Sequence, residues 1–346
     1  MAAQNHPDMS LQSPEPSHRR SDVPHLPDDL IEAIISFLPP KEVSRLAVLS
    51  KRFRAVTLGV HEFELDFTPS AKKYMLSYEL VDVKTIKIMR LVNCELHLPF
   101  VSNGLRHLRE LTFERVRARP VAMQAIFLNC VSLRSLQLIQ CNNVYNLKIA
   151  ALELKDFQNL VVKNCSDVDS VSIKAPALRS FHYHGKICDF KFYSDLPKLN
   201  DVVLEIAHPR GFHLLSNREH VVISLAFVKV LTVTSTFLEL GNNAFGTSVY
   251  WESYGRKYLN EWQTVFPHLK CVKIKGFTLN ELPVTMARFF LKTAVHLHYL
   301  VLVKAKRHYV PETFVPDCLR WGTTSNAQIQ IYDPQGDTSN IIPQYL

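Results

Sequence analysis

Two stretches of the chain repeat each other without a gap: LRSLQLIQCNNVYNLKIAA, residues 133–151, and FQNLVVKNCSDVDSVSIKA, residues 157–175. At a shift of 24 residues, apolar and cysteine positions coincide along both stretches, in the pairs Leu136/Leu160, Leu138/Val162, Cys141/Cys165, Val144/Val168, Leu147/Val171, Ile149/Ile173 and Ala151/Ala175. Such a period indicates one supersecondary unit that is stacked on copies of itself.

The shorter template LxxLxLxx(C/N) extends this repeat in both directions. It fits at starting residues 83, 108, 133, 157, 178, 199, 228, 269 and 297, and the first unit uses Val83, Ile86 and Ile88 as its apolar positions. The alternation in LxL predicts a short strand with one buried face. We therefore expect an α/β fold in which an irregular leucine-rich-repeat solenoid carries a parallel sheet. The convex side should be extended at VYNLKI and VDSVSI and helical at 120–129 and 283–294.

A second apolar segment, LPDDLIEAIISFLPPKEVSRLAVLSKRFR, covers residues 26–54. Asp28 can cap a first helix, Pro39 and Pro40 separate it from a second, and Ser50 can cap a third. On the first helix the apolar positions cover an arc of about 200°, which is wide for a surface helix. These three short helices either dock on the rest of the chain or leave one apolar side for a partner protein.

The order and spacing of Leu26-Pro27-Asp28-Asp29-Leu30, Ile34 to Val43 and Leu49 to Arg54 closely resemble the F-box of plant F-box proteins. In that family the three helices bind the Skp-type adaptor of a Skp–cullin–F-box ubiquitin ligase, and through it a cullin. The resemblance implies an adaptor-binding face formed by Leu26, Pro27, Leu30, Ile31, Ile34, Leu38, Val43 and Leu46.

The repeats also resemble those of plant F-box proteins, and FPHLKCVKIKGF with the later LHYLVL resembles the FBD-type C-terminal module found with them. The organisation that we expect is a disordered segment at 1–20, an F-box at 21–66, degenerate repeats at 67–265, an FBD-like end at 266–307 and an extension at 308–346. The resemblance implies a non-catalytic subunit that recruits a protein substrate for ubiquitination and proteasomal degradation.

Catalytic and cofactor motifs are missing from the sequence. It has no glycine-rich phosphate loop, GxSxG or HExxH, and its seven cysteines are spread singly, so we expect reduced thiols and neither a cofactor nor a catalytic residue. His182-Tyr183-His184 places two histidines on one strand face, but a zinc site needs three or four ligands. We therefore expect no metal.

The net charge of +8 is compatible with an acidic binding partner. Residues 84–119 hold eight Lys and Arg against three Glu, a balance of +5 (8 − 3), and an alternative function is a scaffold that binds nucleic acid there. Aromatic residues are sparse in this region, which favours a solvated edge or a patch for an acidic protein over nucleic acid.

Strand residues between the apolar positions should line the concave face of a solenoid and contact an unknown protein substrate. The candidates are Lys87, Glu110, Thr112, Glu114, Gln137, Asn159, Lys163, His182 and His184. The N-terminus lacks the apolar core of a signal peptide and no apolar run could cross a membrane, so we expect a protein of the nucleus or cytoplasm.

Overall fold

The computed structural model describes residues 61–68, 74–76, 85–96, 98, 104–186, 188–193, 196–206, 225, 227–235, 266–306, 310, 319 and 325–335. The expected disordered segment, the three helices and all eight residues of the expected adaptor-binding face lie outside these ranges. Among the described residues, no helix is both long and apolar enough to cross a membrane.

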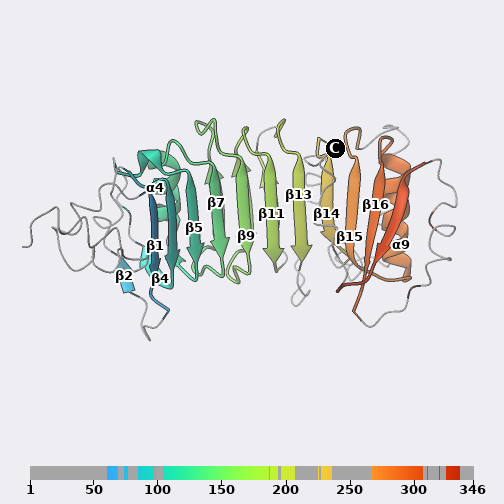
Figure 1. Ribbon diagram of the computed structural model, residues 1–346, viewed down its shortest axis with the longest axis horizontal. Coiled ribbons are helices and arrows are strands. Elements are labelled where there is room, and N and C mark those ends of the chain that lie inside the picture. Colours follow the sequence, from blue (N-terminus) through green and yellow to red (C-terminus); the bar gives the residue numbers. More distant parts are fainter. Residues whose placement is uncertain are drawn as a thin grey trace, which may run out of the picture.

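Eleven parallel strands form the main sheet, which extends across the width of Figure 1. Each strand pairs with the strand of the next repeat, so sequence order is also spatial order. Its strands are β1 (Glu62–Asp66), β3 (Ile88–Val92), β5 (Glu110–Glu114), β7 (Ser135–Ile139), β9 (Asn159–Lys163), β11 (Ser180–Gly185), β13 (Asp201–Ile206), β14 (Val230–Thr234), β15 (Cys271–Phe277), β16 (Tyr299–Lys304) and β17 (Gln328–Tyr332).

All nine predicted repeats contain a strand of this sheet, so the predicted parallel solenoid is confirmed. Two further strands, β1 and β17, lie in the ranges assigned to the F-box and to the C-terminal extension. The predicted register of the first repeat is wrong. Met89 and Leu91 pair with the core residues Leu111 and Phe113, whereas Ile88 is 36% exposed.

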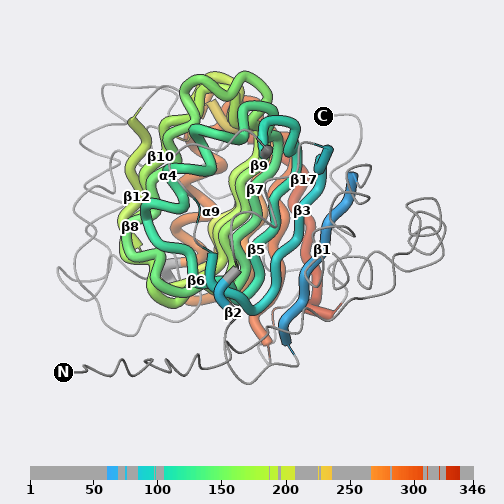
Figure 2. The backbone as a smooth tube through the Cα atoms, turned by 90° about the vertical axis from the view of Figure 1, so that its left-hand side faces the viewer, coloured from blue at the N-terminus to red at the C-terminus, as the bar shows by residue number. Residues whose placement is uncertain are grey.

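A second layer covers the other side of the core, as Figure 2 shows along the axis of the repeat. It contains two small parallel sheets, the helix α4 (Pro120–Asn129) and the helix α9 (Glu281–Thr293). The strands of the small sheets are β2 (Tyr74–Leu76), β4 (Cys94–Leu96), β6 (Arg117–Ala118), β8 (Asn146–Ala150), β10 (Ser170–Lys174) and β12 (Asp189–Phe192). The predicted extended segments and both predicted helices are therefore confirmed.

The core lies between these two layers and reproduces the repeat that is visible in the sequence. Leu136 is in register with Leu160 in the main sheet, and Leu147 with Val171 in the second layer. All four side chains are almost completely buried. Burying a leucine or valine side chain contributes about 1.5–3 kcal/mol, so successive repeats stabilise one another.

A column of residues in the left-handed conformation ends the strands of four successive repeats. Asn93, Arg115, Gln140 and Asn164 have φ between 52° and 54° and follow β3, β5, β7 and β9 directly. The chain turns there from the main sheet towards the second layer. Among residues other than glycine, asparagine accepts this conformation at the lowest cost, because its short side chain can bond locally.

Gln140→Asn should therefore stabilise the fold by about 0.5 kcal/mol, since an asparagine replaces a residue that is strained at this φ. Thermal or urea unfolding of the full chain measures the difference. The reciprocal change, Asn164→Gln at the equivalent position, should destabilise by a similar amount. Equal midpoints for both variants and the parent would contradict the argument.

Candidate binding face

One side of the main sheet faces away from the core, and we call it the outer face. Side chains of a strand alternate between the two sides of a sheet, so each strand offers its first, third and fifth residues here. In β7 these are Ser135, Gln137 and Ile139, while Leu136 and Leu138 are buried. Pairing in register places equivalent residues of neighbouring repeats side by side, about 4.8 Å apart.

Eight of the nine residues predicted for substrate contact lie on this outer face. They are Glu110, Thr112 and Glu114 on β5, Gln137 on β7, Asn159 and Lys163 on β9, and His182 and His184 on β11. Lys87 does not, because the first repeat is shifted; it precedes β3, and Arg90 takes the outer position. Contact between these residues and a substrate stays a prediction.

The N-terminal third of the outer face is acidic. Arg90 binds Glu64 on β1 at 3.2 Å and Glu114 on β5 at 2.7 Å, so one guanidinium links three strands. The hydrogen bond to Glu114 raises the pKa of Arg90. Glu62 and Glu110 are exposed on either side of Ile88 and take part in no ion pair among the described residues.

Two histidine–carboxylate pairs join β11 to β13 on the same face. His182 Nε2 lies 2.7 Å from Asp201 Oδ2, and His184 Nδ1 lies 2.9 Å from Glu205 Oε2. Glu205 also accepts a hydrogen bond from Lys275 Nζ. Burial raises the pKa of Glu205, but the hydrogen bonds from Lys275 and His184 outweigh it and hold the pKa below its ordinary value.

The outer face is less exposed to solvent at β14 and β16, towards its C-terminal end. Val230 and Thr232 on β14 and Val301 and Val303 on β16 are at most 9% exposed, although they point away from the core. The continuously accessible part of the outer face therefore runs from β1 to β13, and the face becomes accessible again at β17, where Gln328 is exposed. It is acidic at β1–β5, neutral at β7 and mixed from β9 onward.

This arrangement offers no recognisable catalytic group among the described residues. Ser180 Oγ donates to Asp201 Oδ2 at 3.1 Å, the carboxylate oxygen that also contacts His182, so the serine is not placed against the imidazole as a nucleophile requires. Burial raises the pKa of Cys130 and of Cys188 to about 12. Within the described ranges, no three His, Cys, Asp or Glu residues could together hold a metal ion.

The basic region at 84–119 is not one surface. Arg90 and Arg115 pair with Glu114. Arg117 and Arg119 both contact Glu95 in the second layer, at 3.4 and 3.3 Å. Half of the eight cations counted in the sequence thus contact a carboxylate, and these four are divided between the outer face and the second layer, so they do not form one cationic patch for nucleic acid.

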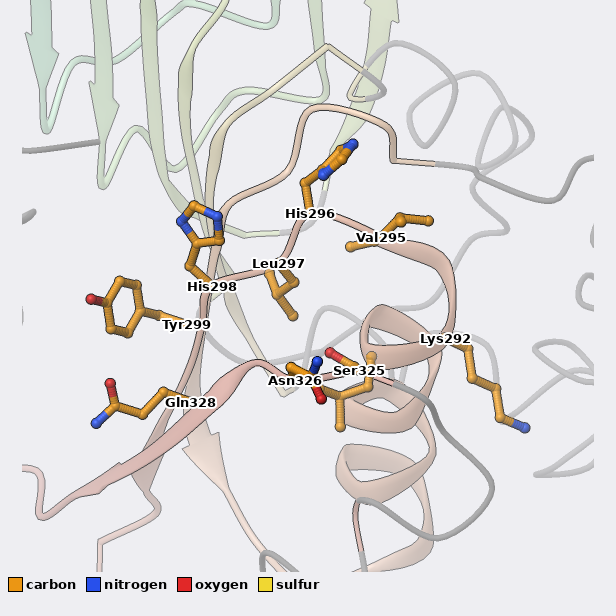
Figure 3. A pocket seen from close by; sticks show the side chains of 11 residues that line it. Lys292, Val295, His296, Leu297, His298, Tyr299, Ser325, Asn326 and Gln328 are labelled. Carbon is orange, nitrogen blue, oxygen red and sulfur yellow. The ribbon is translucent and has the colours of Figure 1, made fainter.

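A hollow of about 520 Å³ lies where α9 ends and β16 and β17 begin (Figure 3). Its polar lining includes Lys292, His298, Tyr299, Asn326 and Gln328. In Figure 3, Tyr299 and Gln328 lie on one side and Lys292 extends on the other, so these groups do not converge on one point. We assign no ligand to it.

The partners of the histidines were missed at the sequence level. Asp201 and Glu205 occupy the outer positions of the repeat that starts at 199, and Lys275 occupies one in the repeat that starts at 269. The repeat register could have identified all three. Their choice of ion-pair partner depends on rotamers that a pattern does not specify.

Two family models match overlapping parts of the chain. A family model described as "At1g61320/AtMIF1, LRR domain" matches residues 49–243, and the F-box domain model matches residues 23–63. Two relatives come from Arabidopsis thaliana. FBD-associated F-box protein At1g61320 is 27% identical over 280 residues, which cover 79% of this chain and 57% of the relative. Putative FBD-associated F-box protein At1g61330 is 31% identical over 130 residues, which cover 37% and 29%. The matched part thus covers little more than half of the first relative and less than a third of the second.

Glu205→Gln should lower the free energy of unfolding at pH 7 by about 1–2 kcal/mol, because Lys275 and His184 lose a charged acceptor in a half-buried position. The carboxylate contributes fully above its ordinary pKa of 4.5, and this contribution disappears as the pH falls through the lower folded value. Urea unfolding from pH 7 to pH 3 should show the two curves converge in acid. Glu110→Gln, a control at an exposed carboxylate outside the ion pairs of the described residues, should change stability by less than about 0.5 kcal/mol.

Proposed function

The chain belongs to the At1g61320/AtMIF1 leucine-rich-repeat family and carries an F-box domain, and we propose that it recruits a protein substrate to a Skp–cullin–F-box ubiquitin ligase. The F-box would bind the Skp-type adaptor, and through it the cullin. The outer face of the main sheet would hold the substrate. The expected location is the nucleus or cytoplasm.

The observation that carries this proposal is the direct passage from the F-box into the solenoid. The F-box match ends at Phe63, and Phe63 is a buried residue of β1, the first strand of the main sheet. The residues that match the F-box domain model therefore extend into the first strand of the solenoid, and no linker separates the two. A substrate on the outer face would therefore be held at a limited range of distances from the adaptor.

The chemistry that such a subunit performs is positioning. Holding a substrate close to a ubiquitin-charged enzyme replaces a bimolecular encounter with a local one and raises the effective concentration of the acceptor lysine. The protein need not form or break a bond.

The double variant Leu26→Ala/Pro27→Ala should abolish co-purification with a Skp-type adaptor, because both side chains belong to the expected adaptor-binding face. The thermal unfolding midpoint should stay within the spread of replicate measurements, since the repeats retain their own core. The control is Asn159→Ala/Lys163→Ala on the outer face, which should keep the adaptor. Normal adaptor binding by the first variant, at normal expression, would refute the proposal.

A further inference from the structure

One row of residues runs along the edge where the strands of the main sheet begin, at the start of each arrow in Figure 1. Each member stands immediately before its strand and is joined to the next repeat through the backbone. Arg109 N donates to Lys87 O at 2.7 Å, Arg134 N to Arg109 O at 2.7 Å, and the pattern continues to His298 N, which donates to Lys270 O at 2.8 Å. Their spacing is therefore that of the strands, about 4.8 Å.

This row is cationic at six of its ten positions from β1 to β16, and we call it the basic edge. Its Lys and Arg members are Lys87, Arg109, Arg134, Arg179, Lys229 and Lys270. Gln158 and Asn200 fill the two interior gaps, and His61 and His298 stand at the ends. No Asp or Glu interrupts these ten positions.

The six cations are not neutralised within the described part of the chain. Its ion pairs use other residues, such as Arg90, Arg117 and Lys275, and none involves a member of the basic edge. Arg109, Arg134, Arg179 and Lys229 are exposed, and Lys87 and Lys270 are partly so. Like charges on adjacent strands repel one another, so an anionic partner would relieve this repulsion.

The surroundings of the basic edge favour a narrow partner. Glu62, Glu110 and Asp201 follow it by one residue on β1, β5 and β13, and Asp156 lies in the turn before β9. A nucleic-acid duplex carries a line of phosphates on each of its two strands and would bring phosphate close to these carboxylates. An extended polypeptide places alternate side chains on opposite sides, so it can present acidic groups to the edge and other groups to its flanks.

We propose that the basic edge binds an acidic, extended segment of a protein. That this segment belongs to the ubiquitination substrate rests on the proposed function; the surface itself does not. From Lys87 to Lys270 the edge spans seven strand spacings, or about 34 Å, which matches about ten residues of extended chain. Acidic residues at every second position would face it.

The test uses the purified full chain and three fluorescein-labelled probes in fluorescence anisotropy at two salt concentrations. The probes are a 12-residue peptide of alternating Glu and Ser, its Gln and Ser analogue, and a 12-nucleotide oligouridylate. The RNA is included because Phe227 stacks on His268 at 5.8 Å beside Lys229, and an exposed ring can also stack on a base. The variant Arg134→Glu/Arg179→Glu reverses two exposed charges of the basic edge. Its matched control, Lys148→Glu/Lys174→Glu, makes the same change on the second layer.

We expect the Glu peptide to bind, the Gln peptide not to bind, and the edge variant to weaken binding about tenfold while the control leaves it within about twofold. Three results would overturn the proposal: no binding of the Glu peptide, equal losses in the edge variant and the control, or tighter binding of the RNA than of the peptide at the same edge. Adaptor co-purification is measured on the same variants. Retained adaptor with failed peptide binding refutes only the basic edge, and lost adaptor with edge-dependent peptide binding refutes only the proposed function.

Discussion

The main-chain register between successive repeats is the constraint on which every surface of this protein depends. Backbone hydrogen bonds between neighbouring repeats, such as Arg134 N to Arg109 O at 2.7 Å, hold residues about two dozen positions apart side by side. A slip of one residue would move Leu136 and Leu138 from the core to the outer face. Because the leucine core prevents this, each position of the repeat keeps one environment along the whole sheet.

Most of the fold follows from that repetition, and the exceptions have physical causes. The predicted first repeat begins three residues too early, because Val83, Ile86 and Ile88 also satisfy the template, while Ile86, Met89 and Leu91 satisfy it with the correct burial. β1 lies inside the range predicted for the F-box, 21–66. β17 was missed because alternating Gln and Ile in QIQIY lacks the leading leucine.

Less of the candidate site could be predicted, because charge pairing depends on geometry across repeats. Lys87, Arg90, Arg109 and Arg117 lie close together in the sequence and belong to its basic region at 84–119. The repeat distributes them by position: Arg90 to the outer face, Arg117 to the second layer, and Lys87 and Arg109 to the edge. The position of a residue within its repeat therefore determines the surface on which it lies, and its distance along the chain from another charge does not.

The cations of the described residues therefore have different surroundings on the outer face and on the edge. On the outer face, Arg90 and Lys275 are matched by Glu64, Glu114 and Glu205, so that surface can discriminate partners through shape and individual hydrogen bonds. Six cations that take part in no ion pair among the described residues lie on the edge beside it. Long-range attraction at an edge accelerates encounter, whereas paired polar groups on a rigid face select among the molecules that arrive. With the two surfaces only one residue apart along each strand, an extended segment attracted to the edge is already within reach of the face that would recognise it.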